Sequence, residues 1–466
     1  MKLYVILIGL LYGGAMIFLS LRARKTVKED SKGYFFAGAG LGTVLGMFTF
    51  AATLFSAFTI LGMPDFFRTH GVGAWIFLAV ADAGMVFGLI WVGRKMKQKG
   101  TEGKKFSITG LISEKYHSPW AGYITFFGAF AFLLPYVAVQ IRGVSMFLQG
   151  AFPDVLPFWA WALGMVVIVL LYSETGGLKA IIYNDTLQGV LLLIAIWVIG
   201  ANCLSMLGGW SNMFEKISQT NEALLSNPGP KGLFTFQFML ASMLAIIMIP
   251  YTQPQVSTRI LIMKDNRSLN RMAVGVGVFA MLVILPTLFV GMYGAVTYPD
   301  ADTDTFLRNA LIIDQPGFIA AFILIGLIAA AISTADSQIF ALGSELMSLL
   351  KGNEKDLLLI TKVFLIFFAG LAFLLSIFSS NELVLLARTS FAGTSLMAPM
   401  IFLGLFSSHK PTLLMPFITL GGLVLFILSS FPGIFHMPSM VGGIRMDLFL
   451  FGILSVTGVG LYLAKK

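Results

Sequence analysis

Charged residues are scarce in this chain, since Asp, Glu, Lys and Arg make up only 11% of its 466 residues. Soluble domains average roughly 25%. Hydrophobic residues reach 57%, and the mean hydropathy is +0.88. This composition excludes an ordinary soluble domain and predicts an integral membrane protein.

Several chemical motifs are missing as well. One cysteine, Cys203, excludes an intrachain disulfide and a cysteine-rich metal site. No GxxxxGK[ST] loop, HExxH, CxxC or TVGYG-like segment occurs, which argues against an ATP-driven pump, an intramembrane enzyme and a potassium-type pore. The four histidines fall in predicted loops or at the ends of apolar runs, so no proton relay is expected: His70, His117, His409 and His436.

Long apolar runs are what the chain has instead. A membrane-spanning helix needs about 20 apolar residues, and the runs are too long for barrel strands. We therefore expect an all-α polytopic bundle. The expected spans number about thirteen: 3–20, 40–63, 73–93, 120–149, 156–173, 187–207, 233–261, 272–296, 317–347, 358–379, 382–406, 412–430 and 446–464.

Lys and Arg predict the orientation, because they concentrate on the cytoplasmic side. If the N-terminus lies outside, 23 of the 31 basic residues fall in cytoplasmic segments or their flanks. We therefore expect a bacterial inner (plasma) membrane protein with its N-terminus outside and its C-terminus in the cytoplasm. The net charge of +9 then reflects topology rather than nucleic-acid binding. The basic stretch "RARKTVKEDSK" follows the first span, as in an uncleaved segment.

Two spans read as broken helices. In the second, Thr53, Ser56 and Thr59 precede Gly62-Met63-Pro64. In the seventh, two prolines bracket a polar tripeptide in "IPYTQPQ". Broken helices at matching positions of two halves point to the central site of an inverted-repeat transporter, although prolines also kink helices without a function.

This spacing predicts one transporter domain, 1–466, with two repeats of five helices each (spans 2–6 and 7–11). The expected parts are an extra span and cytoplasmic loop (1–39), the first repeat (40–207), the second repeat with an extracellular loop at 208–232 (208–406), and two extra C-terminal spans (407–466).

The ninth span carries the polar stretch "AISTADSQ" at 331–338. Lone hydroxyls in membrane helices usually bond the carbonyl one turn earlier or join helices. A neighbouring Ser333-Thr334 pair close to a broken helix suggests instead that hydroxyls and freed carbonyls supply neutral oxygens to a small cation.

Three motifs resemble the sodium:solute symporter family, which includes proline, pantothenate, sialic acid, sodium/glucose and iodide carriers. They are "YSETGGLKAIIYNDTLQG" (172–189), "AISTADSQ" and "YTQPQVSTR". The resemblance covers spans 1 to 11. It implies a leucine-transporter-like fold, an alternating-access cycle and sodium as a co-transported ion.

The resemblance also implies site residues. Sodium would lie between the second and ninth spans, held by the hydroxyls of Ser333 and Thr334 and by carbonyls of Ala330, Ala52 and Phe55. The family's proline carriers have an aspartate where Leu54 stands here, so that carboxylate is absent. The solute pocket would be lined by Ser56, Thr59, Tyr136, Gln140, Arg142, Tyr251, Thr252 and Gln253.

Arg142 is the most informative of these residues. Burying an arginine in a bilayer costs at least about 2.5–3.5 kcal/mol, so its side chain should face a partner or a cavity. A guanidinium suits a solute carboxylate. The alternatives are a pair with Asp82 or Glu345, or snorkelling to the outer surface. Arg388 is a weaker candidate, for which snorkelling is favoured.

Two acidic residues are possible cytoplasmic ion or gating groups. Asp185 would contact an ion transiently, or would cap a helix that follows it. Asp336 would support the sodium site, pair with Lys179 or Arg259, or take a second cation or a proton.

We therefore expect a sodium-coupled symporter, not an enzyme, that imports a small organic solute. Arg142 favours a carboxylate-bearing anion, such as a monocarboxylate, sialic acid or a carboxylate vitamin. A proline-type amino acid or a sugar is the alternative, and a transport-dead sensor or a channel is the alternative of another class. The expected partners are the solute, sodium and the lipid bilayer, with no nucleic acid and no obligatory protein partner.

Overall fold

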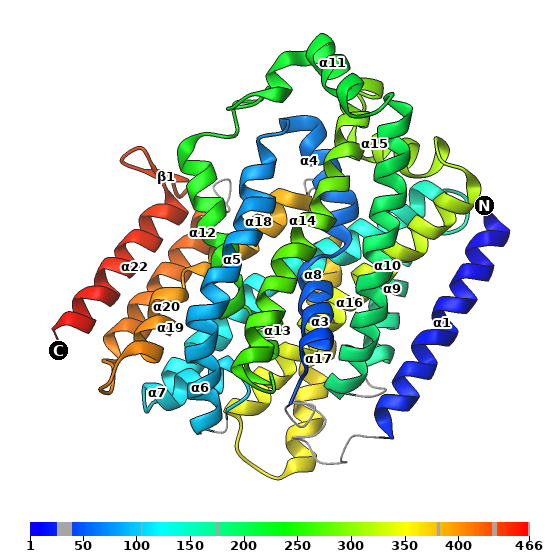
Figure 1. Ribbon diagram of the computed structural model, residues 1–466. Helices are drawn as coiled ribbons and strands as arrows, with labels where there is room; N and C mark the ends of the chain where they lie inside the picture. The colour runs from blue at the N-terminus through cyan, green and yellow to red at the C-terminus, as the bar shows by residue number, and fades with distance from the viewer. Residues whose placement is uncertain (26–39, 104, 174–176, 380–382, 431–435, 465–466) are drawn as a thin grey trace.

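The computed structural model describes residues 1–25, 40–103, 105–173, 177–379, 383–430 and 436–464 (Figure 1). The described chain is a bundle of helices, with α1 and α22 at opposite edges (Figure 1). The helices are α1 (Lys2–Arg24), α3 (Thr43–Leu54), α4 (Met63–His70), α5 (Ala81–Gly88), α6 (Arg94–Gly103), α7 (Ile108–Lys115), α8 (Pro119–Ala151), α9 (Phe158–Ser173), α10 (Gly177–Met206), α11 (Trp210–Asn221), α12 (Phe236–Thr252), α13 (Pro254–Leu261), α14 (Asn266–Thr297), α15 (Thr303–Arg308), α16 (Gly317–Leu349), α17 (Glu354–Phe378), α18 (Leu383–Ser395), α19 (Ala398–Phe406), α20 (Leu414–Ser429) and α22 (Met446–Leu463).

Short elements complete the described fold. Four π-helical turns and one 3-10 turn join or extend the helices: Phe58–Gly62, Ile76–Val80, Leu89–Gly93, Asn309–Ile313 and Glu222–Leu225. Strands β1 (Met440–Val441) and β2 (Ile444–Arg445) pair in antiparallel fashion just before α22. The sequence pattern did not predict this small hairpin, because two-residue strands are too short to show a period.

Nine helices in the described ranges are long and apolar enough to span a membrane, and eleven spans result if each of two bent pairs counts as one. At the two remaining expected positions the structure has the shorter apolar helices α9 and α20, of 16 residues each. The prediction of an all-α polytopic membrane protein is confirmed.

Both predicted broken spans are broken in the structure. The bend is 59° between α3 and the segment Phe58–His70, and 53° between α12 and α13. In the second pair the cause is Pro254, because the residue before a proline is forced out of helical geometry. Gln253 accordingly has φ −104° and ψ 122°.

The first break lies earlier than the motif suggested. It falls just after α3, where Phe55 is extended with φ −93° and ψ 124°. Gly62, Met63 and Pro64 instead continue without interruption into α4, with Pro64 in the first turn, where its missing N–H costs nothing.

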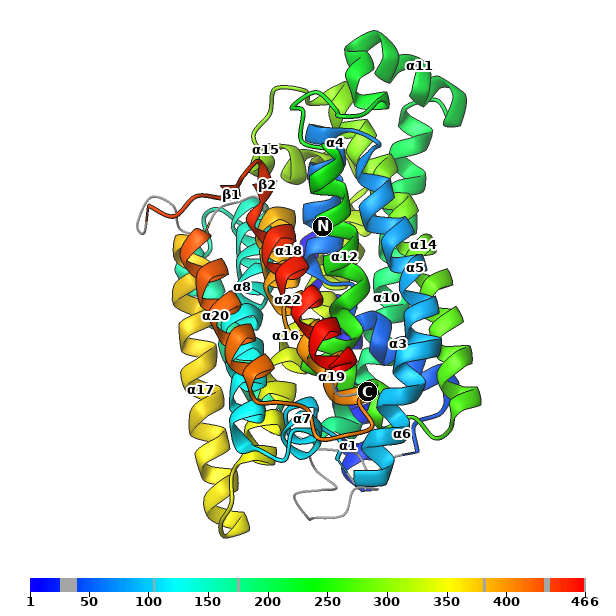
Figure 2. The same cartoon turned by 90° about the vertical axis from the view of Figure 1, so that its left-hand side faces the viewer.

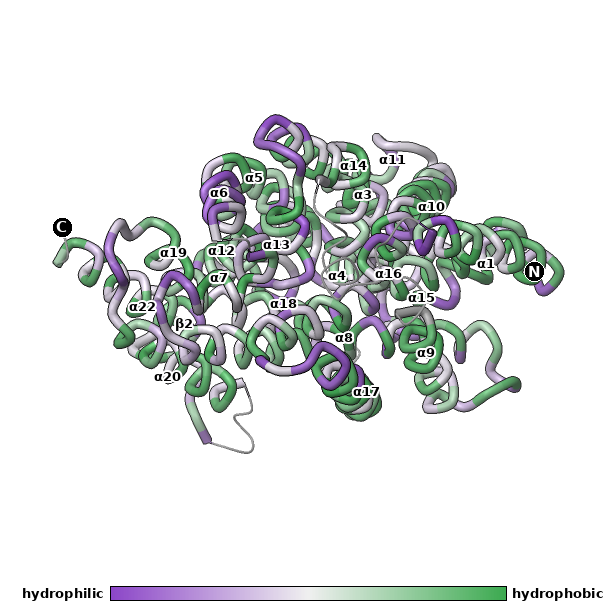
Figure 3. Tube along the Cα trace, turned by 90° about the horizontal axis from the view of Figure 1, so that it is seen from below, coloured by the Kyte–Doolittle hydropathy of each residue, from purple (hydrophilic) through white to green (hydrophobic). Residues whose placement is uncertain are grey.

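Helix α16 forms the centre of the bundle and packs against α8, α10 and α1 (Figure 2). Small residues permit this close packing, since a Cβ on Gly326 would lie 2.8 Å from the Cβ of Ala195 in α10. Hydrophilic residues gather near α6 and α17 at the end of the bundle seen in Figure 3, and the outer helices are hydrophobic. Polar groups on α16 therefore lie deep inside an apolar bundle.

Candidate ion and solute site

The break after α3 faces the polar stretch of α16. The hydroxyls of Ser333 and Thr334 both donate to the carbonyl oxygen of Ala52, at 3.3 and 3.1 Å. Both side chains are buried. Two hydroxyls and one carbonyl that the helix has released therefore converge on one point.

The other two predicted sodium ligands, Ala330 and Phe55, are close in sequence to these residues. Ala330 lies one turn before Ser333 and Thr334 on α16, and Phe55 is the first residue beyond α3. All five are neutral oxygen donors, and this chemistry fits a small monovalent cation. Among the described residues no cluster of three or more His, Cys, Asp or Glu side chains could hold a transition metal.

A buried carboxylate adjoins the hydroxyls. The Ser333 hydroxyl lies 2.6 Å from Oδ1 of Asp185, which is on α10 and 1% exposed. The helix begins at Gly177, so Asp185 lies inside it, and the alternative of an N-cap is wrong. The structure thus joins a possible ion or gating residue directly to the predicted sodium site.

Asp185 is paired with an arginine that the sequence analysis did not place in the site. Arg259 of α13 lies 3.4 Å from Oδ2 of Asp185, and both side chains are 1% exposed. The guanidinium also donates to the hydroxyls of Ser337, at 2.8 Å, and Thr49, at 3.3 Å. The only available signal was the arginine that ends "YTQPQVSTR".

This buried pair holds four helices together: α3, α10, α13 and α16. Asp336, which is fully buried on α16, acts electrostatically on Arg259. Its role as a support for the sodium site or as a second cation site stays a prediction.

Two predicted solute residues on α8 hold the broken segment in place. The Tyr136 hydroxyl donates to the Leu54 carbonyl at 2.9 Å. The Gln140 side-chain oxygen accepts a hydrogen bond from the Ala57 N–H at 3.2 Å. Both side chains satisfy backbone groups that the helix break releases, which would otherwise be costly in an apolar interior.

Ser56 and Thr59 stabilise the restart of the helix. The Ser56 N–H donates to the Thr59 hydroxyl at 3.1 Å, and the Ser56 hydroxyl accepts from the Phe58 N–H at 3.3 Å. These side chains act as helix caps in this conformation.

The predicted solute residues of the second break point in different directions. Tyr251 packs against Phe402, and its buried hydroxyl has no hydrogen-bond partner among the described residues. The Thr252 hydroxyl donates to the carbonyl of Met248 in its own helix. The Gln253 amide donates to the Thr394 hydroxyl of α18 at 3.2 Å.

Arg142 contacts the end of α17 and the start of α9. Its guanidinium donates to the carbonyl of Ser376 at 2.7 Å, near the C-terminal end of α17, and lies 5.4 Å from the Phe158 ring centre. The alternative pair with Asp82 or Glu345 is wrong. The Glu345 carboxylate instead accepts hydrogen bonds from Ile108 and Thr109.

The chain is similar in sequence and in fold to known proteins. Residues 34–411 match the model of the Sodium:solute symporter family. The chain belongs to this family. It is a family of transporters rather than of enzymes, and in it sodium is a co-substrate, not a cofactor. The resemblance seen in the three motifs is thereby confirmed, although residues 174–176 of the first motif lie outside the described ranges.

Curated members of the sodium:solute symporter family are distant in sequence. The sodium/pantothenate symporter of Haemophilus influenzae is 26% identical over 338 residues, which are 70% of this chain and 67% of that protein. That of Escherichia coli is 23% identical over 66% of this chain and 63% of its own length, slightly less than two thirds. The osmoregulated proline transporter OpuE of Bacillus subtilis is 22% identical over 85% of this chain and 82% of its own.

Solved structures show the shared fold. A sodium-coupled sialic acid symporter aligns with a TM-score of 0.78 and 15% identity, covering 99% of this chain and 97% of that one. MhsT, solved with L-phenylalanine, aligns with a TM-score of 0.56 and 13% identity, covering 91% and 99%. The leucine-transporter-like fold that the family resemblance implied is confirmed.

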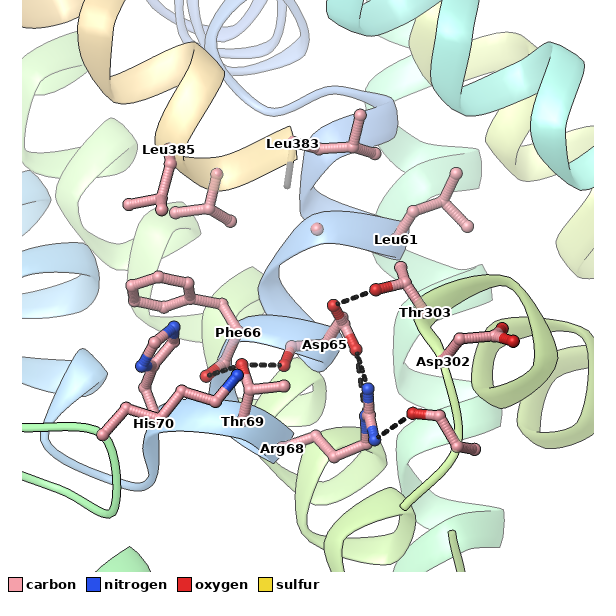
Figure 4. Close-up of a pocket in the computed structure, with 14 residues that line it drawn as sticks. Leu61, Asp65, Phe66, Arg68, Thr69, His70, Asp302, Thr303, Leu383 and Leu385 are labelled. Atoms are coloured by element: carbon pink, nitrogen blue, oxygen red, sulfur yellow. Dashed lines mark hydrogen bonds and ion pairs between the residues drawn. The ribbon is translucent and has the colours of Figure 1, made fainter. Parts of the chain in front are cut away.

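A cavity of about 300 Å³ lies along α4 in this symporter fold (Figure 4). Asp65 on its wall accepts hydrogen bonds from Arg68 at 2.7 Å and from Thr303 at 2.9 Å. A second, narrower cavity lies between the first break, α5, α12 and α18. Val384 lines both cavities, so the two adjoin and form a candidate route toward the site.

Tyr136→Phe tests whether α8 supports the break at the sodium site. Loss of the donor to Leu54 should lower the free energy of unfolding by about 1–3 kcal/mol and weaken sodium binding. Tyr116→Phe is the matched control, because its hydroxyl donates at 2.8 Å to Met400, remote from the break. Thermal unfolding with and without sodium should show similar stability losses but a weaker sodium response in Tyr136→Phe alone.

Arg142→Gln separates a structural from a solute-binding role. Because the guanidinium satisfies carbonyls of α17 at residues 376 and 377, the substitution should lower the free energy of unfolding by roughly 1–3 kcal/mol. Solute affinity should not change. Unchanged stability together with lost binding of a carboxylate solute would show instead that Arg142 is a carboxylate clamp.

Proposed function

We propose that this protein is a sodium-coupled symporter that imports a small organic solute by alternating access. The convergence of the Ser333 and Thr334 hydroxyls on the released Ala52 carbonyl carries this proposal. Helices broken within the membrane provide such carbonyls to sodium in transporters of this architecture. One sodium ion that enters at 100 mV releases about 2.3 kcal/mol before its concentration gradient is counted, which is enough to concentrate a solute more than tenfold.

The proposed sodium ligands are the carbonyls of Ala52, Phe55 and Ala330 and the hydroxyls of Ser333 and Thr334. A hydroxyl that binds a cation through its lone pair must send its proton elsewhere. The Asp185 carboxylate, 2.6 Å from the Ser333 oxygen, can accept that proton's hydrogen bond while the ion is bound. We therefore propose that Asp185 orients a sodium ligand.

The proposed solute is a small carboxylate-bearing molecule, with a proline-type amino acid or a sugar as the alternative. The distant relatives named for pantothenate and proline support a carboxylate, since both molecules contain one. The proposed binding residues are Ser56, Thr59, Tyr136, Gln140, Tyr251, Thr252 and Gln253. Most of these side chains already form hydrogen bonds to the backbone or to neighbouring side chains. A bound solute would therefore have to replace some of those hydrogen bonds.

The proposed orientation keeps the N-terminus outside and the C-terminus in the cytoplasm of a bacterial inner membrane. Helices α1 and α22 both run downward in Figure 1, which is compatible with termini on opposite sides. Repeat boundaries at 40–207 and 208–406 remain part of this proposal.

Uptake into proteoliposomes tests the function. Vesicles that contain the purified protein should accumulate one of labelled pantothenate, L-proline or sialic acid when an inward sodium gradient is imposed. Equal uptake in an inward potassium gradient, or uptake that persists after a sodium ionophore collapses the gradient, would contradict sodium coupling.

A further inference from the structure

The narrow cavity beside the first break is almost entirely apolar. Its volume is about 20 Å³, room for about one water molecule. It is lined by Leu54, Phe55, Phe58, Met63, Phe77, Leu78, Asp82, Ser242, Ile246, Ile249, Val384, Arg388 and Phe391. Both broken spans contribute to this wall, through the 54–63 segment and α12, so the cavity lies where solute and ion sites meet in this architecture.

One carboxylate in this wall has no partner. Asp82 of α5 is 5% exposed, and no described residue donates a hydrogen bond to its side chain or forms an ion pair with it. An isolated ionised carboxylate in an apolar interior costs several kcal/mol. A group this costly is expected to be satisfied by something that enters the cavity.

The one cation among the described residues of the wall is already paired. Arg388 lies 2.7 Å from the Asp447 carboxylate and donates to the Ser242 hydroxyl at 2.7 Å. Its guanidinium also lies 4.8 Å from the Phe238 ring centre. Arg388 is therefore buried and ion-paired. The expectation that its side chain snorkels to the membrane surface is wrong. Arg445 shares the Asp447 carboxylate at 3.3 Å. Arg388 thus has its own acidic partner, and no ion pair between described residues joins it to Asp82.

The rest of the wall favours an organic cation over a metal ion. Sodium requires several oxygen ligands, and Ser242 is the only neutral polar side chain among the described residues that line this cavity. Four phenylalanine rings line it instead: Phe55, Phe58, Phe77 and Phe391. Aromatic faces attract ammonium groups and also accept the apolar carbon skeleton of an amine.

We propose that Asp82 binds a protonated amine of the transported solute, between the rings of Phe55, Phe58, Phe77 and Phe391. This inference rests on the proposed symport function and narrows its solute class. With the carboxylate proposed above, the solute becomes a zwitterion; without it, the solute is a simple organic cation. The cavity must widen to admit either one, as a site that opens and closes alternately would.

Three compounds that share a five-membered ring distinguish these chemistries: pyrrolidine, L-proline and cyclopentanecarboxylate. In sodium buffer, L-proline, or L-proline and pyrrolidine, should raise the melting temperature of the purified protein, and cyclopentanecarboxylate should not. Proline alone shifting the melting temperature would indicate a zwitterion, and both amines shifting it equally would indicate a cation site.

Asp82→Asn should weaken amine binding by about tenfold to a hundredfold, because a charge-assisted contact is lost. In sodium-free buffer without amine, the same variant should melt no lower than wild type, since Asp82 has no hydrogen bond to a described residue that asparagine would lose. A merely structural carboxylate would give a lower melting temperature. Asp314→Asn is the matched control, because Asp314 accepts hydrogen bonds from Tyr293 and Tyr298 away from this cavity.

The inference fails if cyclopentanecarboxylate stabilises the protein as strongly as the amines, if Asp82→Asn keeps amine binding, or if no amine shifts melting. Sodium alone reports separately on the proposed function. A sodium-specific shift that persists beside any of these results would overturn only the amine site. Loss of the sodium shift as well would overturn the symport proposal itself.

Discussion

The Ser333→Ala, Thr334→Ala double variant is expected to lose the stabilisation that sodium gives to the wild-type protein. A ligand that binds only the folded state adds about 2.7 kcal/mol to the free energy of unfolding at a hundredfold excess over its Kd. Both hydroxyls point to the Ala52 carbonyl, at 3.3 and 3.1 Å, so their removal deletes two of the five proposed ligands. Thermal unfolding in sodium and in choline measures the effect.

Ser344→Ala is the matched control on the same helix. Its hydroxyl is buried but donates only to the Phe340 carbonyl one turn earlier, at 3.1 Å. This variant should keep the full sodium response. A double variant that keeps the sodium response would place the ion elsewhere in the bundle.

Arg259→Met should be among the most destabilising single substitutions in the chain. It leaves the Asp185 carboxylate buried and without its cation, and breaking one partner of a buried ion pair costs about 3–5 kcal/mol. The pair is 3.4 Å apart and joins α13 to α10. The free energy of unfolding in detergent, from denaturant titration, measures this loss.

The double variant Arg259→Met, Asp185→Asn should recover much of that stability, because no uncompensated charge remains. Lys99→Met is a control for charge removal, since Lys99 pairs with Glu102 on the exposed helix α6 and should matter little. If Arg259→Met alone were as stable as wild type, the pair would contribute nothing to holding the helices together.

The sequence predicted the helices well because the bilayer imposes length and apolarity on them. The break at Gln253 was also predictable, since Pro254 acts on the residue before it. The break at Phe55 was not located correctly, because no proline causes it. Partners from α8 stabilise that break instead: Tyr136 bonds the Leu54 carbonyl.

The candidate ion site was predictable from neighbouring hydroxyls and motif similarity, whereas its ion pair was not. Asp185 and Arg259 are far apart in the chain and meet only after four helices pack. For Arg142 the sequence analysis predicted a place in the solute pocket, whereas its guanidinium bonds to α17 in the structure. Gln140 and Arg142 are two residues apart on one helix, so their side chains point about 200° apart and cannot line one cavity from the same face.

Asp82 illustrates what a sequence alone cannot show. Its position on an apolar span suggested only a partner for Arg142. Its environment is built by side chains from α5, α12, α18 and the first break, which become neighbours only in the folded bundle. The absence of a partner for Asp82 among those neighbours is what suggests a ligand.

Binding of radiolabelled sodium to the purified protein tests the central claim most directly. The account predicts saturable binding that unlabelled sodium displaces and that potassium and choline do not. It also predicts that binding is lost in Ser333→Ala, Thr334→Ala and kept in Ser344→Ala. Equal binding to wild type and the double variant, or displacement by potassium as efficient as by sodium, would contradict a sodium site between α3 and α16.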